Sequence, residues 1–178
     1  MSTTPADRAA RLTQLWVDHQ PAIAAFARRR VDAATADDVV SEVFIVAWRR
    51  LDEVPRDERA WLIGVARNVV MTQQRGSQRA LSLVSRVAAQ PRAQLVAEDD
   101  EGAERVDLAR AWSQLAEPDR ELLALTAWDG LSVAQAASVL CIPRTTCAMR
   151  LLRARRRFAT LADDDGPSPS FVPPTKGP

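Results

Sequence analysis

The side chains best suited to chemistry in this sequence lie in a basic segment toward its C-terminal end. Between Gly130 and Ala162 there are six Arg and no Asp, Glu or Lys. An ordinary solvated helix interleaves acids with bases, because opposite charges three or four residues apart stabilise it. The hydroxyls of Thr145 and Thr146 come before the arginines, so groups for base edges precede groups for phosphates. This order indicates nucleic-acid binding, and a solvated cationic helix face is the simpler alternative.

Apolar spacing predicts which side of this basic helix is buried. At 100° per residue, Cys147, Leu151, Ala154 and Phe158 form one stripe that faces a core. The opposite face carries Arg156 and the residues that we expect to contact duplex DNA, namely Arg144, Thr145, Thr146, Met149, Arg150, Arg153 and Arg157.

A short helix is expected directly before the basic one. Ser132 and Gln135 have the spacing of a capping box, and an apolar stripe from Val133 to Leu140 follows. The turn Cys141–Pro143 then separates the two helices. Two helices joined in this way resemble a helix-turn-helix, whose second helix enters the DNA major groove.

No set of catalytic or metal-ligating residues is evident in the sequence. His19 is the one histidine, and it has no partner at metal-ligand spacing. The pairs Asp37-Asp38 and Asp99-Asp100 suit a helix start and a solvated linker, and no glycine-rich phosphate loop occurs. We therefore expect a binding protein that is not an enzyme and needs no cofactor or metal.

Periodicity predicts an all-α fold of two small helical domains joined by a flexible linker. The expected domains are residues 5–76 and 104–162, with a linker at 77–103 and a disordered Pro-rich tail at 163–178. In the first domain a helix covers residues 5–30, with a possible break at Pro21. The next helix starts at a capping box formed by Thr35 and Asp38, and a third covers residues 60–75. The second domain is expected to hold helices at residues 103–115, 118–128, 132–140 and 143–161.

The overall composition says little about binding partners but more about the cellular compartment of the protein. The formal net charge is only +1, although an acidic block at Glu98–Asp107 contrasts with the basic segment. Cys141 and Cys147 are the two cysteines, too few for a disulfide framework. No apolar run reaches the length of a membrane span, and the N-terminus has no signal-peptide core. A cytoplasmic protein without membrane insertion is expected.

The helix that begins near Asp37 is apolar around most of its circumference. Val39, Val40, Val43, Phe44 and Ala47 lie on its apolar stripe, and further apolar residues widen it. This pattern fits either deep burial or a surface for a large partner. Polar residues would form the rim of that surface, namely Asp38, Glu42, Arg49 and Arg50.

The helix after Ala60 has an apolar side and a mixed side. Its mixed side combines an aromatic ring, an amide, a hydroxyl and an arginine, a set that suits unpaired nucleic acid. These groups belong to Trp61, Asn68, Thr72 and Arg75. The alternative for Trp61 is an ordinary place in the core.

Together these segments resemble extracytoplasmic-function sigma factors of the sigma-70 family. Residues 37–51 (DDVVSEVFIVAWRRL) and 60–68 (AWLIGVARN) are similar to the second conserved region of that family. Residues 115–123 (LAEPDRELL), 129–132 (DGLS) and 150–157 (RLLRARRR) are similar to the fourth. The order, the spacing and the acidic linker also match.

The resemblance implies a sigma factor that binds core RNA polymerase and directs promoter-specific initiation. It implies that residues 37–51 dock on the β′ clamp helices, that the β flap is a second contact, and that an anti-sigma factor is a further partner. The polymerase contacts would be Asp38, Val39, Glu42, Ile45, Trp48 and Arg49. The melted −10 element would meet Trp61, Arg67, Asn68, Thr72 and Arg75, and the helix after Pro143 would bind the −35 duplex.

The sequence departs from the family pattern at three places. The loop 52–59 is a residue or two shorter than is common, which bears on the choice of −10 bases. Ala148 stands where the family often has lysine, so one phosphate contact is lost. Cys141 stands where glycine is usual in the turn, and a left-handed backbone there carries a modest cost.

Two other functions fit part of the sequence. A stand-alone helix-turn-helix regulator would bind a palindromic operator as a dimer without polymerase. A protein-interaction module, such as an anti-sigma decoy, would leave no footprint on any promoter. The absence of acids across Gly130–Ala162 argues against the second.

Overall fold

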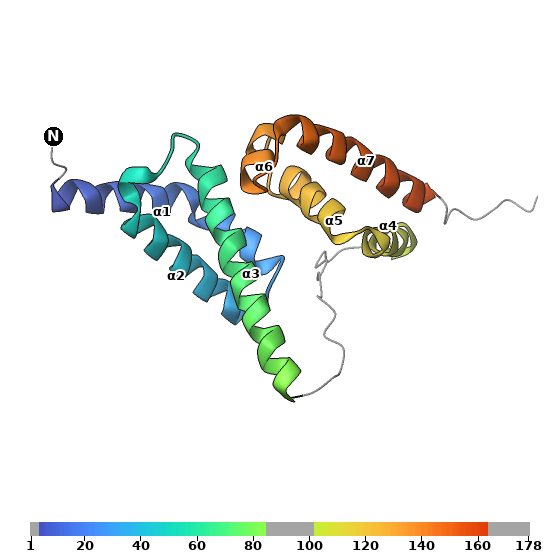
Figure 1. Cartoon of the computed structure of the whole chain (residues 1–178), viewed down its shortest axis with the longest axis horizontal. Helices are drawn as coiled ribbons and strands as arrows, with labels where there is room; N and C mark the ends of the chain where they lie inside the picture. The colour runs from blue at the N-terminus through green and yellow to red at the C-terminus, as the bar shows by residue number, and fades with distance from the viewer. Residues whose placement is uncertain (1–3, 85–101, 164–178) are drawn as a thin grey trace, which may run out of the picture.

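The computed structural model describes residues 4–84 and 102–163, and all regular structure within these two stretches is helical. Figure 1 shows the helices in two groups along the chain. The elements are α1 Pro5–Arg28, α2 Ala33–Arg49, η1 Leu51–Glu53, α3 Glu58–Val84, α4 Gly102–Gln114, α5 Glu117–Leu123, η2 Ala124–Trp128, α6 Val133–Val139 and α7 Arg144–Asp163. The predicted all-α fold is confirmed.

The first group consists of α1, α2 and α3, which pack against one another in all three pairs. Apolar residues at helical spacing point inward from each helix, as burial of apolar surface requires. Fully buried residues of this core include Leu15, Ile23, Phe26, Val39, Val43, Leu62 and Ile63. The core fixes the outward faces of α2 and α3.

In the second group, α7 packs against α4, α5 and α6. The buried residues of this group include Leu122, Leu125, Ala136, Cys147, Leu151 and Ala154. Trp112 contacts Trp128 at 4.5 Å and Phe158 at 6.1 Å between ring centroids. These aromatic contacts join α4, η2 and α7, so α7 is held along one side and free along the other.

The helix starts follow local hydrogen-bonding chemistry, with one correction. Asp32 caps α2, accepting a hydrogen bond from the Thr35 backbone N–H at 3.0 Å. The capping box predicted at Thr35 and Asp38 is therefore wrong, because a carboxylate three residues earlier already satisfies that N–H. The pKa of Asp32 is lowered by its hydrogen bonds to the backbone and side chain of Thr35.

Helix α1 continues through Pro21 without a break. Proline removes one backbone hydrogen bond, the one to the carbonyl four residues earlier. Pro21 is exposed and Val17 is 64% exposed, so water can reach this part of the helix and the missing bond costs little. The first helix is thus continuous from Pro5 to Arg28.

The predicted helix at 118–128 consists of two parts. Pro118 lies in the first turn of α5, as expected, but a π-turn follows at Ala124–Trp128. Thr126 donates its hydroxyl to the carbonyl of Leu122 at 3.0 Å, and the N–H of Asp129 reaches Ala124 at 2.9 Å. The wider turn ends the helix and leads directly to Asp129, a buried acid.

The predicted linker and tail fall mostly outside the described residues. Helix α3 continues to Val84, and α4 begins at Gly102, so the ends of the predicted linker 77–103 are helical. Residues 85–101 and 164–178 are not described. The domain boundaries at 76 and 104 remain predictions.

Glu58 ties the start of α3 to α1. It forms an ion pair with Arg11 and lies 3.1 Å from the Nε2 atom of His19. Burial alone raises the pKa of Glu58, but the hydrogen bonds and charges of Arg11 and His19 outweigh it, and the pKa is lowered. A carboxylate with a lowered folded-state pKa stabilises the fold above the pKa of the unfolded chain. That contribution is lost as the pH falls through the folded-state pKa.

We therefore expect Glu58→Gln to lower the thermal midpoint by a few degrees at neutral pH. The difference from the parent protein should shrink as the pH falls below about 4, where the parent carboxylate also becomes neutral. Thermal unfolding followed by circular dichroism across this pH range is the measurement. Glu53→Gln is the control, because its pair with Arg50 is exposed and contributes little. A difference that is equal at every pH would contradict this role for the charge.

Candidate nucleic-acid interface

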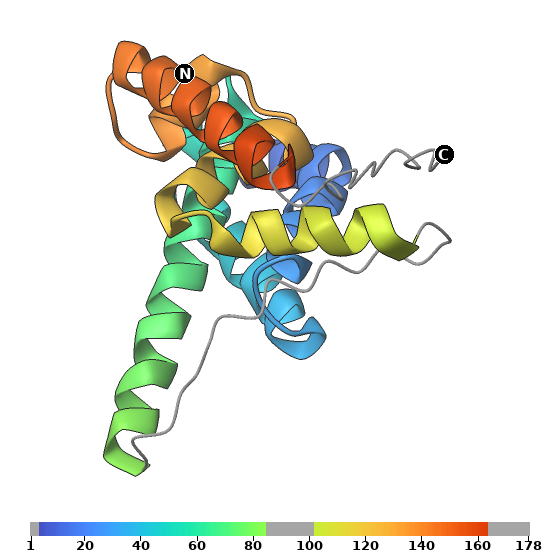
Figure 2. The ribbon, with the colours of Figure 1, turned by 90° about the vertical axis from the view of Figure 1, so that its right-hand side faces the viewer.

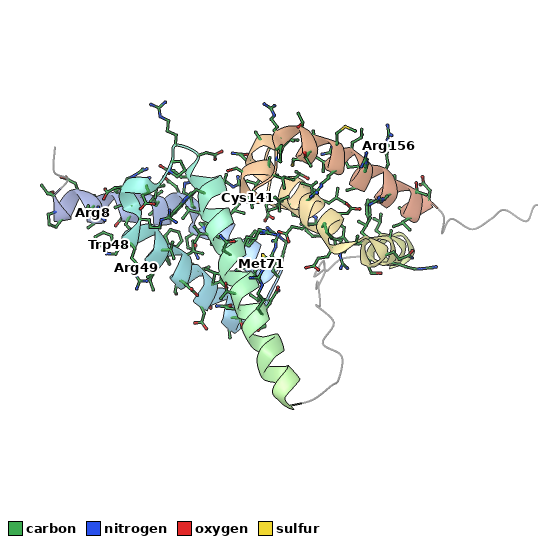
Figure 3. The ribbon with its side chains drawn as sticks, viewed as in Figure 1. Arg8, Trp48, Arg49, Met71, Cys141 and Arg156 are labelled. Atoms are coloured by element: carbon green, nitrogen blue, oxygen red, sulfur yellow. The ribbon has the colours of Figure 1, made fainter. Side chains whose placement is uncertain are left out.

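Helix α7 presents the predicted DNA-binding face to solvent. Cys147, Leu151 and Ala154 are buried, and Phe158 is partly buried against the core, which confirms the predicted inward stripe. Among the residues predicted for duplex contact, Thr146 is half-buried. The others are exposed, namely Arg144, Thr145, Met149, Arg150, Arg153 and Arg157. Figure 3 shows the outer side of α7, marked by Arg156, lined with side chains that extend away from the rest of the protein.

Most arginines of this face have no acidic partner. Within the described residues, no carboxylate lies in ion-pairing range of Arg144, Arg150 or Arg153, so their charges are available to an external anion. Arg157 differs, because its Nη1 atom lies 2.5 Å from Asp119 of α5. That ion pair braces α5 against α7, which gives Arg157 a structural contact in addition to any contact with DNA.

The turn before α7 has the geometry that the sequence predicts. The side chain of Ser132 accepts from the N–H of Gln135, and the Gln135 side chain bonds the Ser132 N–H in return. At the other end of α6, Cys141 has a φ of 54°. Its N–H bonds the carbonyl of Ser138, and the N–H of Ile142 bonds that of Ala137. These two bonds form a Schellman motif, which ends α6 and lets α7 begin at a sharp angle.

Helix α3 carries the residues predicted to meet the melted strand. Asn68, Thr72 and Arg75 are exposed, and their spacing of four and three residues places them on one side of the helix. Trp61 lies on the same side but is half-buried and packs against the core, so the structure supports the core alternative for most of its ring. Helix α6 packs against α3.

Arg67 occupies a different position from the other four residues. Its Nε atom lies 3.4 Å from a carboxylate oxygen of Glu121, a residue of α5 in the second group. In this arrangement the guanidinium of Arg67 is thus covered by the second group of helices. Sequence reasoning could not find this pair, because the two residues are far apart in the chain.

Helix α2 has one mixed polar and apolar face that is open to solvent. Asp38, Glu42, Ile45 and Arg49 are all exposed, and steps of four, three and four residues place them on a single stripe. Ile45 is 49% exposed and Trp48, beside the stripe, is 40% exposed. Large apolar side chains that remain this open, flanked by charges, are typical of a protein-binding surface.

Val39 is the exception among the predicted polymerase contacts. Its side chain is fully buried between the helices of the first group. The residue lies in the middle of the inward stripe, where packing against α1 and α3 uses all of its surface. The prediction that Val39 meets a partner is therefore corrected.

Helix α1 adds residues to this surface that are not predicted from the sequence. The guanidinium of Arg8 lies 5.3 Å from the ring of Trp48, a cation–π contact, and Arg8 also pairs with Asp52. Trp16 is 43% exposed, and its ring lies 4.6 Å from that of Phe44. Figure 3 shows Arg8, Trp48 and Arg49 together at the end of α1 and α2 that is far from α7. The one signal in the sequence that could have indicated this part of the surface was the aromatic residue Trp16.

The described residues contain no group of three or more His, Cys, Asp or Glu that could hold a metal ion. His19 is engaged with Glu58. None of the helices in the part of the chain that the structure describes is long and apolar enough to cross a membrane. Cys147 is buried, and burial raises the pKa of its thiol although Arg150 opposes the effect.

Comparisons with known families match both groups of helices. Residues 15–80 match Sigma-70 region 2, and residues 105–158 match Sigma-70 region 4. The RNA polymerase sigma factor CnrH of Cupriavidus metallidurans is 33% identical over 165 residues, which cover 85% of this chain and 86% of CnrH. The ECF RNA polymerase sigma factor SigL of Mycobacterium tuberculosis is 32% identical over 162 residues, covering 88% and 91%.

The chain belongs to the extracytoplasmic-function group of the sigma-70 family. It is a sigma factor of transcription initiation, as the sequence predicts, and members of this family are DNA-binding regulators rather than enzymes. Region 2 corresponds to α1–α3 and region 4 to α4–α7.

Two solved sigma-factor structures are similar to this one over most of the chain. CnrH in complex with the cytosolic domain of CnrY has a TM-score of 0.57 at 30% identity, covering 87% of this chain and 89% of CnrH. The sigma factor RpoE in complex with the anti-sigma factor NepR from Bartonella quintana has a TM-score of 0.62 at 26% identity, covering 86% and 98%.

Proposed function

We propose that this sigma factor uses three separate faces for three tasks. The exposed stripe of α2 docks on the β′ clamp helices of core RNA polymerase, and region 4 meets the β flap. The mixed side of α3 takes the melted −10 strand, and the outer face of α7 reads the −35 duplex. The observation that carries this proposal is the orientation of α7, whose apolar stripe is buried while unpaired arginines face solvent.

At the −35 element, α7 supplies two kinds of contact. Thr145, Thr146 and Met149 lie at its N-terminal end, where a recognition helix reaches base edges, and each good base contact contributes on the order of 1–3 kcal/mol of discrimination. Arg150 and Arg153 lie further along the helix and neutralise phosphates. Each neutralised phosphate makes affinity fall by about 0.9 log units per tenfold rise in salt.

At the −10 element, α3 offers groups that suit unpaired bases. The exposed amide of Asn68 can read a base edge, while the Thr72 hydroxyl and the Arg75 guanidinium can bind the backbone. An unpaired base presents its Watson–Crick edge only after melting. This face therefore favours the open strand over the duplex.

On α2, the stripe from Asp38 to Arg49 is proposed to bind polymerase. Its acids are near the N-terminal end and its arginine is near the C-terminal end, with Ile45 between them. Such a surface combines an apolar centre with charged groups that set orientation. Arg8 and Trp16 of α1 extend it.

Docking on polymerase allows regions 2 and 4, each of which binds DNA weakly alone, to bind one promoter specifically. Each region buries little surface on DNA by itself. When both are held at promoter spacing, the second contact becomes intramolecular and gains a high effective concentration. In this scheme the polymerase sets the distance between the two regions. We place this function in the cytoplasm, where polymerase and chromosome are both present.

An anti-sigma factor is the proposed regulator. The similar sigma factor RpoE was solved with the anti-sigma factor NepR, and CnrH with the cytosolic domain of CnrY. The exposed apolar residues on both regions, including Trp48 of region 2 and Leu152 of region 4, offer surface for such a partner.

The proposal predicts that Asn68→Ala weakens promoter opening while duplex binding at −35 is kept. Loss of one base-edge contact should reduce the extent of −10 melting about tenfold, in line with a contact of 1–3 kcal/mol. Permanganate reactivity of −10 thymines in the complex with core polymerase measures opening, and protection of the −35 element is the internal control. Unchanged opening by the folded variant would remove Asn68 from the −10 contact.

A further inference from the structure

Regions 2 and 4 contact each other directly in this structure. Helix α6 packs against α3, although 48 residues of sequence, 85–132, lie between the end of α3 and the start of α6. Figures 1 and 2 show α6 beside the N-terminal half of α3 in both views. The amide of Gln135 donates to a carboxylate oxygen of Asp57 at 3.0 Å across this contact. Regions 2 and 4 are therefore packed together, and we call this arrangement the closed chain.

Asp129 is the centre of the contact. Its carboxylate is only 1% exposed and pairs with Arg29 and, at 3.1 Å, with Arg30, the two residues that follow α1. Its backbone carbonyl accepts a hydrogen bond of 2.7 Å from Arg59 of α3. A single residue of region 4 thus engages three arginines of region 2.

Glu121 is the second acid at this contact. Its carboxylate lies 3.8 Å from Arg30 and 3.4 Å from Arg67. The Nε atoms of Arg29 and Arg67 are buried without a hydrogen-bond partner, and so is the facing oxygen of Glu121. These unmet hydrogen bonds mean that the ion pairs fit imperfectly, which lowers the cost of separating them.

Arg30 is the most enclosed of the four arginines. Its guanidinium lies 3.6 Å from the ring centroid of Phe26, and its side chain is 14% exposed. Burial lowers the pKa of Arg30, and the charges of Asp129 and Glu121 oppose that effect. Because arginine stays protonated, this site needs an anion whenever region 4 covers it.

We infer that Arg29, Arg30, Arg59 and Arg67 form a phosphate-binding surface of region 2, which Asp129 and Glu121 occupy when the chain is closed. The inference rests on the proposed function, since the phosphates are those of promoter DNA. Arginine forks suit carboxylates and phosphates equally well. The two acids of region 4 therefore compete with DNA for the same four guanidinium groups.

Promoter geometry requires that this contact opens. The −10 and −35 elements are about 25 base pairs apart, and at 3.4 Å per base pair this is roughly 85 Å of duplex. With α6 against α3, region 4 cannot lie that far from region 2. The closed chain is thus unable to read both elements at once. Opening frees the four arginines at the moment when DNA is presented to α3.

Asp129→Asn is the direct test, with Glu117→Gln as a matched control. Both variants remove one negative charge from region 4, but Glu117 is exposed and forms none of these contacts. The full-length proteins are titrated, without polymerase, against a short fluorescein-labelled single-stranded DNA at low salt. Asp129→Asn should bind it about tenfold more tightly than the parent, a usual size for coupled equilibria, and Glu117→Gln should match the parent. Small-angle X-ray scattering should show a larger radius of gyration for Asp129→Asn alone.

Asp129→Asn combined with Arg30→Ala separates opening from binding. This double variant should stay extended but lose the gain in DNA affinity, because one phosphate ligand is missing. A folded Asp129→Asn protein with the compactness and DNA affinity of the parent would overturn the inference. If that variant does not fold, Glu121→Gln replaces it with the same expected signs. Failure of the parent protein to bind core polymerase would instead reject the proposed function and leave the scattering result standing.

Discussion

Glu42→Lys should abolish most binding to core RNA polymerase while the protein stays folded. Glu42 is exposed on the stripe of α2 that is proposed to dock on the clamp helices, between Asp38 and Ile45. A reversed charge inside a docked interface places like charges together and leaves one desolvated without a partner. We expect affinity to fall by at least about thirtyfold, equivalent to roughly 2 kcal/mol.

Trp48→Ala tests the same surface through its apolar part. Trp48 is 40% exposed and is contacted by Arg8, so it is held in place before any partner arrives. Tryptophans of this kind are common hot spots, and their loss costs about 2 kcal/mol or more. Both variants are measured by competition for core polymerase against the parent protein.

Glu53→Lys is the matched control for Glu42→Lys. It reverses an exposed acid of region 2 outside the α2 stripe, on η1, where its partner is Arg50. Binding of polymerase should change little. If a folded Glu42→Lys protein assembled holoenzyme as well as Glu53→Lys, the docking assignment for α2 would be rejected.

Arg150→Ala should weaken binding at the −35 element and flatten its salt dependence. Arg150 is exposed on the outer face of α7, and within the described residues no acid pairs with it. Loss of one phosphate contact should reduce the slope of log affinity against log salt by about 0.9. At low salt this corresponds to about a tenfold loss of affinity for the −35 duplex.

Arg155→Ala is the control on the same helix. Arg155 is also exposed, but it lies on the opposite side of the buried stripe from Arg150. Both substitutions favour helix, so helix propensity does not confound the comparison. Fluorescence anisotropy of a labelled −35 duplex in holoenzyme, measured over a range of salt concentrations, gives both slopes. Equal slopes for the two variants would place the DNA on another face of α7.

The sequence alone predicted those features of the site that arise from local rules. The left-handed backbone at Cys141 was expected from the family resemblance, because glycine is usual at that position. The capping box at Ser132 and the inward stripe of Cys147, Leu151 and Ala154, by contrast, depend on residues within a few positions of each other. Periodicity and capping chemistry operate at that range. The exposed face of α7 follows directly from them.

Features that depend on competition between neighbours were harder to predict. Asp32 and Thr35 are both capping residues, and which of them starts α2 depends on the backbone of the preceding loop. Pro21 was a possible break, yet α1 continues because its exposed turn remains open to water. The apolar circumference of α2 was consistent with burial or docking, and the packing of α1 and α3 shows which of its residues are buried. Val39 is buried, whereas Ile45 is not.

Contacts between the two regions were beyond sequence reasoning. Arg29 and Asp129 are a hundred residues apart, and no local pattern relates them. From the sequence, Arg67 is predicted to contact the −10 strand, and Asp129 is only part of a motif. Their positions at one interface emerge only when the packing of α6 on α3 is known.

The most direct test of the account is a start-site experiment with the purified chain and core polymerase of its own bacterium. Genomic DNA fragments serve as template, and the 5′ ends of the transcripts are sequenced with and without the chain. The account predicts a set of new start sites that core polymerase alone does not use, each preceded by two shared elements near −10 and −35. No new start sites, or new sites that share only one element, would contradict the claim that both regions hold one promoter.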